Sequence, residues 1–236
     1  MNKKMKNQIK RDLSGFYIKK ICLLIYVFSL INHAMKNVFP LFNTPIDLAH
    51  SFWEKILDNG DIVIDATCGN GKDSLKLSLL LQKKINTSLF CLDIQEIAIA
   101  KTKKLIEEKN PEFIPNTHFF LGSHEEIEKI TTEKCKLIVY NLGYLPSGDK
   151  SVTTVPSSTL KSISQALNML VNGGVISITC YPGHEEGKKE KIALYSLLSS
   201  LDAKNWSVAS IDWENRNEAP SLLLVQKNLE SDKPLI

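Results

Sequence analysis

The chain has 236 residues, of which 43% are hydrophobic and 23% are charged, and its formal net charge is +3. These values are those of an ordinary soluble domain, and the charge is compatible with an RNA partner but too small to indicate one. The five cysteines show no C-x-x-C spacing, and the histidines form no pair at metal-ligand spacing. We therefore expect neither a disulfide framework nor a metal site.

The N-terminal residues 1–34 differ in composition from the rest of the chain. A basic head leads to the apolar run Ile21–Ile31, which is shorter than the roughly 20 residues that a membrane-spanning helix needs. The pattern is similar to a signal peptide, but residues 32–34 do not form a small-x-small cleavage site. Met35 opens a sequence that continues directly into the domain. We expect residues 1–34 to be an extension outside the fold, with a membrane-associating N-terminus as the alternative.

Strands and helices are expected to alternate from Thr44 onward. An amphipathic helix is expected at 44–57, with Thr44 as N-cap, and the segment Asp58–Gly60 is expected to turn the chain into the first strand. Further helices are expected after Gly71 and at Ile94–Lys109, Ser123–Ile130, Pro156–Leu170 and Lys188–Leu201, with a turn at Asn172–Gly174. Strands are expected at Ile62–Ile64, Ser88–Asp93, Thr117–Gly122, Cys135–Asn141, Val175–Cys180, Trp206–Trp213 and Ser221–Lys227. This alternation predicts an α/β fold with a mostly parallel seven-stranded sheet, an antiparallel edge, and helices on both faces.

The segment Asp61–Asp73 carries the most informative pattern. Asp65 ends a buried β-branched strand, and Gly69 and Gly71 allow a tight turn in which the backbone can approach a ligand. A dinucleotide-binding turn would have a third glycine where this chain has Ser74. The pattern D-x-x-x-G-x-G is instead typical of S-adenosylmethionine (SAM) methyltransferases. A structural turn without a ligand is the alternative.

Polar residues at the ends of the next strands are candidate ligand contacts, because ligands of such sheets bind at the carboxyl ends of the strands. Asp93 can accept hydrogen bonds from both ribose hydroxyls, or it caps the helix that follows. Ser123 and His124 stand where an adenine edge would lie; an N-cap and an exposed histidine are the alternative. Asp65 can orient water or the ammonium group of the ligand, or it accepts hydrogen bonds from its own turn.

Two later segments reach the same edge of the expected sheet. Asn141–Lys150 follows the fourth strand, where the carbonyl of Asn141 can accept an N–H from an attacking amine and Tyr144 can stack on a base. A surface turn rich in Gly and Pro is the alternative. In Tyr181–Lys189, His184 can contact substrate or phosphate, or it is a solvated loop histidine. We expect His50 to face solvent or to be satisfied in the core rather than to bind a ligand.

Four segments together resemble one family: DATCGNGKD (65–73), LDIQ (92–95), NLGYLPSGDKS (141–151) and PGHEEGKKE (182–190). They are similar to small bacterial methyltransferases, once labelled rRNA methylases, that modify the wobble uridine of tRNA. The resemblance covers roughly residues 35–228 and implies a Rossmann-like SAM methyltransferase domain, followed by a tail at 229–236.

The resemblance implies transfer of a methyl group from SAM to the amine of 5-aminomethyl-(2-thio)uridine at tRNA position 34, in the anticodon loop. It implies a cytoplasmic enzyme without a metal. The implied SAM contacts are Asp65, Gly69, Asn70, Gly71, Asp93, Gln95, Ser123 and His124. The implied acceptor contacts are Asn141, Leu142, Gly143 and Tyr144, beside the charged Lys150. Asp149 and His184 are candidate bases for the amine, because the amine must be unprotonated to attack.

Two other functions stay open on the sequence. The first is a SAM methyltransferase that acts on another RNA, such as rRNA, or on a small amine. The second is a SAM- or nucleotide-binding module without catalysis. The sequence leaves open which tRNA species are used and what the oligomeric state is, a homodimer included.

A chain shortened to begin at Met35 is expected to fold, stay soluble and keep full activity, because the first helix that the core needs begins near Thr44. Solubility and methyl transfer, measured side by side for the shortened and full-length proteins, check this. Loss of activity, or sedimentation of the full-length protein with membranes through residues 21–31, would contradict it.

Overall fold

The computed structural model describes residues 44–143 and 154–230. The chain divides into two compact units, Met1–Thr44 and Pro45–Ile236, and the fold below belongs to the second unit. None of the helices within the described ranges is long and apolar enough to cross a membrane.

Several sequence predictions lie outside the described residues. They are the extension at 1–34 and the candidate site residues Tyr144, Asp149 and Lys150. The tail expected at 229–236 is described only as far as Glu230.

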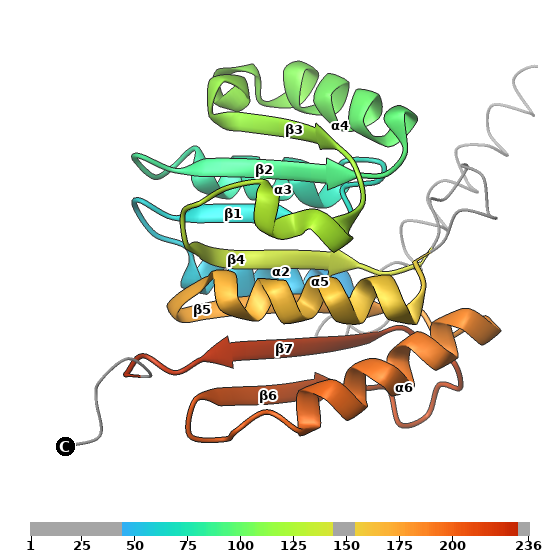
Figure 1. The fold of residues 1–236 in the computed structure, drawn as a ribbon. Helices are drawn as coiled ribbons and strands as arrows, with labels where there is room; N and C mark the ends of the chain where they lie inside the picture. The colour runs from blue at the N-terminus through green and yellow to red at the C-terminus, as the bar shows by residue number, and fades with distance from the viewer. Residues whose placement is uncertain (1–43, 144–153, 231–236) are drawn as a thin grey trace, which may run out of the picture. The chain divides into compact units, whose positions relative to one another are not determined.

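Seven strands form one sheet in the order β3-β2-β1-β4-β5-β7-β6 (Figure 1). The first five strands pair in parallel, β7 is antiparallel to β5, and β6 is antiparallel to β7. The strands are β1 (Ile62–Asp65), β2 (Ser88–Asp93), β3 (Thr117–Leu121), β4 (Cys135–Asn141), β5 (Leu170–Cys180), β6 (Trp206–Ile211) and β7 (Ser221–Lys227). The predicted seven-stranded sheet with an antiparallel edge is confirmed.

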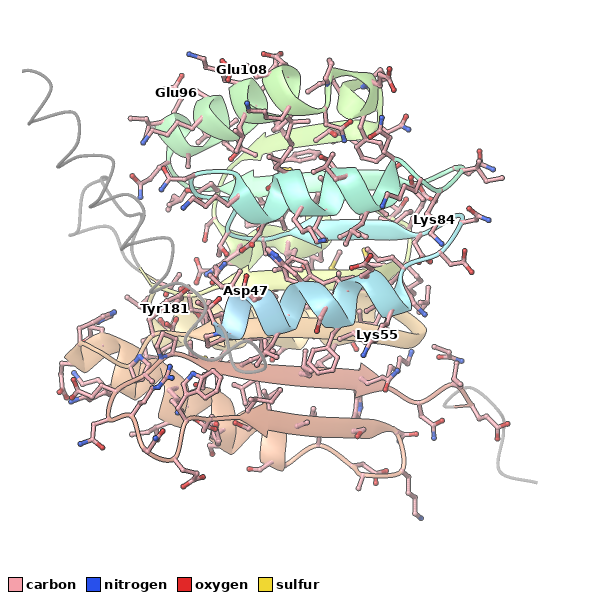
Figure 2. The ribbon with its side chains drawn as sticks, turned by 180° about the vertical axis from the view of Figure 1, so that it is seen from behind. Asp47, Lys55, Lys84, Glu96, Glu108 and Tyr181 are labelled. Atoms are coloured by element: carbon pink, nitrogen blue, oxygen red, sulfur yellow. The ribbon has the colours of Figure 1, made fainter. Side chains whose placement is uncertain are left out.

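Helices cover both faces of this sheet, as predicted. Figure 2 shows α2 (Pro45–Ile56), α3 (Lys72–Leu81) and α4 (Glu96–Lys109) in front of one face. Figure 1 shows the opposite face, which carries the 3-10 helix η2 (His124–Lys129), α5 (Pro156–Met169) and α6 (Glu185–Ser199). A second 3-10 helix, η1 (Pro111–Asn116), connects α4 to β3.

The period-two alternation of the central strands divides the core into two layers. Ile64 of β1 and Tyr140 of β4 pack in the layer that includes Ile163 of α5. Val63, the neighbour of Ile64, packs in the other layer with Trp53 of α2. Each of these side chains is fully or almost fully buried, and burial of a large apolar side chain contributes about 1.5–3 kcal/mol. The strands at the centre are therefore held from both faces, which fixes the positions of their ends.

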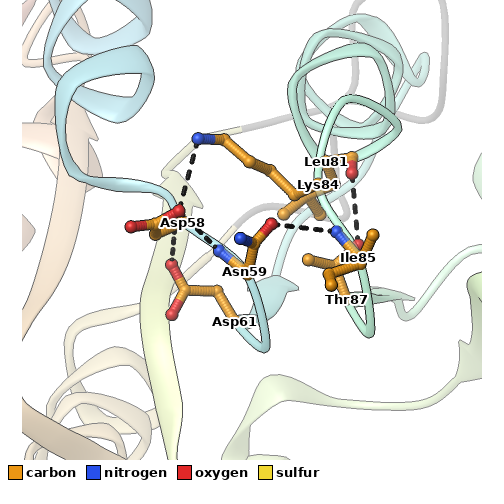
Figure 3. Close-up of polar contacts among 7 residues, drawn as sticks. All are labelled: Asp58, Asn59, Asp61, Leu81, Lys84, Ile85 and Thr87. Carbon is orange, nitrogen blue, oxygen red and sulfur yellow. Dashed lines mark hydrogen bonds and ion pairs between the residues drawn. The ribbon is translucent and has the colours of Figure 1, made fainter.

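The amino-terminal edge of β1 is closed by the expected turn at Asp58–Gly60, which is confirmed (Figure 3). The N–H of Asp58 donates to Asp61 Oδ2 at 2.6 Å, and the N–H of Ile85 donates to Asn59 Oδ1 at 3.1 Å. Lys84 Nζ lies 3.4 Å from Asp58 Oδ1. These contacts tie the α2–β1 connection to the α3–β2 connection at one end of the sheet. Figure 2 places Lys84 at this end and Tyr181 at the opposite one.

The turn expected at Asn172–Gly174 is wrong, because these residues belong to β5. Cys135 pairs with Leu170 but Leu137 pairs with Val175, so a register shift in β5 takes up the additional residues. Gly173 has φ 73°, and a Cβ on Gly174 would lie 2.9 Å from the carbonyl oxygen of Val171. The glycines are thus required by an irregularity within a strand rather than by a turn between elements.

Candidate active site at the carboxyl edge of the sheet

Polar residues from separate parts of the chain meet where the parallel strands end. Asp65 ends β1, Asp93 ends β2, Asn141 ends β4, and His124 and Tyr181 follow β3 and β5. Because β3, β2, β1, β4 and β5 are neighbours and parallel, these residues share one edge. The predicted convergence of these positions at one edge of the sheet is confirmed.

The turn between β1 and α3 depends on two glycines. Gly69 has φ 52° and Gly71 has φ 79°, both in the left-handed region. A Cβ on Gly71 would lie 2.8 Å from Thr102 Cα of α4. Thr102 Oγ1 also donates to the carbonyl oxygen of Gly69 at 3.3 Å. One side of the turn therefore packs tightly against α4. The other side faces the carboxyl edge of the sheet.

Asp93 connects this turn to the next strand. Its Oδ2 accepts the N–H of Gly69 at 2.9 Å, and its Oδ1 accepts the N–H of Gln95 at 2.9 Å. The N-cap of α4 is Gln95, and no side chain caps this helix, so Asp93 holds the residue before the helix and the capping role considered for it is wrong. An ionised carboxylate has about four acceptor positions, and two hydrogen bonds leave capacity for the two ribose hydroxyls. The two backbone contacts of Asp93 are thus compatible with ligand binding at the same carboxylate.

The carboxylate of Asp65 accepts hydrogen bonds from residues of the turn and of the start of α3. It is 1% exposed, its Oδ2 accepts the hydroxyl of Ser74 at 2.6 Å, and its Oδ1 accepts the N–H of Thr67 at 3.3 Å. Burial, with a further contribution from the charge of Asp73, raises the pKa of Asp65 to about 7. These contacts give Ser74 a role where a dinucleotide-binding turn has glycine. Direct contact of Asp65 with a ligand stays a prediction.

The far side of the candidate cofactor site is formed by residues after β3. Ser123 caps η2, since its Oγ accepts the N–H of Glu125 at 3.2 Å, as one alternative expected. The other half of that alternative, an exposed histidine, is wrong, because His124 is 7% exposed. Neither ring nitrogen of His124 has a hydrogen-bond partner among the described residues, and burial lowers its pKa.

A neutral, buried imidazole without a partner is unusual, because buried polar groups are normally hydrogen-bonded. At this edge it fits a heterocycle such as adenine, which has both donors and acceptors. The unused acceptor positions of Asp93 fit a ribose. Asn70 lies in the glycine turn, between Gly69 and Gly71, and is partly buried, and its Oδ1 accepts a hydrogen bond from Lys101 Nζ at 3.3 Å. The residues present therefore fit an adenosyl group.

Asn141 is the centre of a hydrogen-bonded chain at the acceptor side. Its amide nitrogen donates to Asp73 Oδ2, its Oδ1 accepts the hydroxyl of Tyr181 at 3.2 Å, and its backbone N–H donates to Thr67 Oγ1 at 2.7 Å. The other carboxylate oxygen of Asp73 lies 2.6 Å from His50 Nε2. The chain His50–Asp73–Asn141–Tyr181 thus joins α2, α3 and the ends of β4 and β5.

Of these four residues, only Asn141 was predicted from the sequence to be a site residue. His50 does not face solvent freely, because its Nε2 is satisfied by the buried Asp73, as the second of the two expected alternatives had it. One signal was present: His50 lies on α2 between the buried residues Ala49 and Trp53, so its side chain could not be far from the core. Asp73 carries a weaker signal, since it stands in the first turn of α3 directly after the glycines.

Leu142 and Gly143, which follow Asn141, have mainly structural roles. The side chain of Leu142 is 1% exposed and lies in the core, so the predicted substrate contact cannot come from this side chain. The N–H of Gly143 donates to Thr154 Oγ1 at 2.9 Å, and its carbonyl accepts the N–H of Thr154 at 3.2 Å. Thr154 Oγ1 in turn donates to the buried Glu190 at 2.9 Å, and Thr159 Oγ1 donates to the same carboxylate at 2.5 Å.

His184 is a helix cap rather than a solvated loop residue, so the loop alternative is wrong. Its Nδ1 accepts the N–H of Gly187 at 3.1 Å, and α6 therefore begins at Glu185 instead of the predicted Lys188. Because the Nδ1 lone pair is engaged, the geometry gives no support to His184 as a base. Across residues 44–143 and 154–230, no group of three side chains could hold a metal ion.

Comparison with known proteins places this site in a family. Residues 89–227 match a family model described as "Putative rRNA methylase". The tRNA (mnm(5)s(2)U34)-methyltransferase of Arabidopsis thaliana, a chloroplastic protein, is 33% identical in an alignment of 190 residues that covers 77% of this chain and 68% of the relative. The chain belongs to this methyltransferase family.

Crystal structures of family relatives have the same fold. A protein from Clostridium thermocellum described as a "putative rRNA-methylase" is 34% identical, with a TM-score of 0.73 over 78% of this chain and 98% of that one. A protein from Streptococcus mutans described as a "putative methyltransferase", crystallised with S-adenosylhomocysteine (SAH), is 36% identical, with a TM-score of 0.70 and the same coverage. The resemblance found in the sequence and the Rossmann-like methyltransferase fold are both confirmed.

Substitution of Gly71 by Ala is expected to lower the free energy of unfolding by about 2–4 kcal/mol, because strain at positive φ adds to a clash with Thr102. Gly60→Ala is the matched control, since Gly60 has φ 78° but nothing within 4 Å of its Cβ position. It should lose only the strain, about 1–2 kcal/mol. Urea unfolding of both variants measures the difference, and equal losses would show that the Thr102 contact is unimportant.

Proposed function

We propose that this protein is a SAM-dependent N-methyltransferase that converts 5-aminomethyl-(2-thio)uridine at position 34 of tRNA to its 5-methylaminomethyl form. The observation that carries the proposal is the amide of Asn141, held between Asp73 and Tyr181 at the end of β4. The substrate is supported by the name of the Arabidopsis thaliana relative.

SAM is the proposed cofactor, and the relative crystallised with SAH supports it. The ribose would bind Asp93, the adenine would lie against His124, and the amino-acid end would lie at the turn that contains Gly69 and Gly71. When bound, SAM supplies an electrophilic methyl group attached to a positively charged sulfur. Gln95 precedes α4 and Ser123 caps η2, so both residues lie at helix starts that border this site.

The acceptor side orients the attacking amine. Because Asp73 accepts from the amide nitrogen of Asn141, the amide oxygen points toward Tyr181 and away from Asp73. That oxygen can accept an N–H of a neutral amine and leave the nitrogen lone pair directed at the methyl carbon. Positioning of two reactants can supply about 7–11 kcal/mol of the barrier. The reaction then needs little covalent assistance from the protein.

The proposed macromolecular partner is the anticodon loop of tRNA. A target base in a folded loop must be extruded to reach the edge of the sheet. The net charge of +3 is small, so we expect binding to use a limited number of phosphate contacts and to weaken with salt. We place the reaction in the cytoplasm, a location supported by Cys68, Cys91, Cys135 and Cys180, which are all free and buried.

Replacement of Asn141 by Ala or Asp is expected to reduce kcat by about 100-fold, because one positioning contact is lost. The Asp variant adds a charge that stabilises the unreactive ammonium, so the same shape does not preserve activity. The assay is methylation of tRNA that carries 5-aminomethyl-2-thiouridine, with rRNA and tRNA lacking this nucleoside as comparison substrates. SAH affinity, measured separately, should change little. Near-normal turnover in both variants would remove Asn141 from the acceptor site, and preference for rRNA would change the assigned substrate.

Replacement of Asp93 by Ala is expected to weaken SAH binding by about 1–3 kcal/mol, because two charge-assisted hydrogen bonds to the ribose are lost. Asp58→Ala is the matched control: Asp58 also accepts a backbone N–H in a turn, at 2.8 Å from Asn59 N, but at the opposite edge of the sheet. Isothermal titration calorimetry on both folded variants checks the prediction. Equal affinity for the two variants would show that Asp93 only holds the backbone N–H groups of Gly69 and Gln95.

A further inference from the structure

The proposed reaction releases a proton that some group must accept. At neutral pH the substrate amine is an ammonium, and only the neutral amine has a lone pair for attack. Loss of one proton from the ammonium nitrogen frees this pair. The nitrogen then forms a bond to the methyl carbon while the carbon–sulfur bond breaks and its electrons pass to sulfur. The products are a secondary ammonium, a neutral thioether and one proton on an acceptor.

Several candidate acceptors near Asn141 are already engaged. Asp65 is buried and accepts hydrogen bonds from Ser74 and Thr67. Tyr181 donates to Asn141, and burial raises its pKa to about 12, so it keeps its own proton. The Nδ1 of His184 caps α6.

His50 has a different arrangement. Its Nε2 lies 2.6 Å from Asp73 Oδ1, and an ionised carboxylate can only accept hydrogen bonds. The proton of the neutral imidazole is therefore on Nε2, which leaves the lone pair on Nδ1. Among the described residues Nδ1 has no hydrogen-bond partner, and the side chain is 21% exposed. An imidazole oriented by a carboxylate in this way is a ready proton acceptor.

The position of His50 in the fold agrees with this role. It lies on α2, one turn after Asp47, and Figure 2 places Asp47 and Tyr181 at the same end of the sheet. Asp73 accepts from His50 and from the amide of Asn141, so one carboxylate orients both the proton acceptor and the amide. Partial exposure gives a bound proton a route to solvent after each turnover.

We propose that His50 and Asp73 act as the proton-accepting pair for the substrate amine, with His50 taking the proton on Nδ1 and Asp73 stabilising the imidazolium. This inference rests on the proposed function of the site. The same carboxylate is a positioning residue for Asn141, since it fixes which end of the amide faces the acceptor.

The charges around His50 set the expected pH dependence. Asp73 on α3 faces the imidazole directly, Asp65 of β1 lies behind Asp73, and Tyr181 completes the chain. On α2 itself, Asp47 precedes His50 by one turn, and Glu54, one turn later, lies 3.9 Å from Lys76 of α3. The charged side chains around the imidazole are thus mainly carboxylates, of which Asp73 is in direct contact with it.

The test compares His50→Ala and His50→Gln with Glu54→Gln, which removes the neighbouring contact between α2 and α3. Gln can still donate to Asp73 but cannot take a proton, so it separates packing from proton transfer. Single-turnover methyl transfer is measured on tRNA with 5-aminomethyl-2-thiouridine from pH 6 to 10, with and without added imidazole. SAH affinity and urea unfolding are measured on the same proteins.

We expect both His50 variants to lose at least about 100-fold in rate at pH 7, the usual contribution of a general base. The loss should shrink at high pH, where solvent deprotonates the amine, and imidazole should partly restore the Ala variant. SAH affinity and the Glu54→Gln rate should stay within about threefold, a difference of less than 1 kcal/mol.

Two results would overturn the inference while the wild-type protein forms product. One is a His50→Ala rate near that of the wild type, and Asp149→Asn would then identify the remaining candidate base. The other is a loss that is independent of pH and is not restored by imidazole, which would mean a structural role. A wild-type protein that forms no product from this tRNA would contradict the proposed function, and the inference with it.

Discussion

The contact between the glycine turn and α4 is the constraint on which the candidate site depends. Gly71 can approach Thr102 so closely only because it has no Cβ and adopts positive φ. This approach directs the N–H of Gly69 to Asp93 and places Ser74 against Asp65. It also sets the first turn of α3, and with it Asp73, beside the end of β4. One backbone turn thereby orients three carboxylates that come from two strands and a helix.

Much of the fold could be predicted from the sequence because its strands are short, apolar and bounded by polar residues. The limits of Ser88–Asp93, Cys135–Asn141 and Ser221–Lys227 were predicted as observed. The start of β5 could not be predicted in this way, because Asn172–Gly174 has the composition of a turn. Only the register against β4, a contact distant in sequence, decides that the strand includes these residues. The start of α6 is set by the hydrogen bond from the N–H of Gly187 to Nδ1 of His184. Helix propensities do not include a histidine cap of this kind, so they do not predict where the helix begins.

The candidate site was predictable where position alone decides it. Asp93 and Asn141 end strands of a parallel sheet, so the topology brings them to one edge whatever their side chains contact. The roles of Asp73, His50 and Tyr181 could not be predicted from their positions at strand ends alone. His50 and Asp73 are 23 residues apart, Asp73 and Asn141 are 68 apart, and Asn141 and Tyr181 are 40 apart. No short sequence pattern predicts contacts between residues so far apart in the chain. These contacts form only when α2 and α3 pack on the sheet.

The pairing of Gly143 with Thr154 links the end of β4 to α6. Thr154 Oγ1 accepts the N–H of Gly143 and donates to the buried carboxylate of Glu190, which also accepts the hydroxyl of Thr159 on α5. One buried carboxylate of α6 is therefore the acceptor for two hydroxyls that come from separate parts of the chain. Loss of that carboxylate would leave both hydroxyls unpaired in the interior, which is costly, and the backbone beside Asn141 would lose its support from α6.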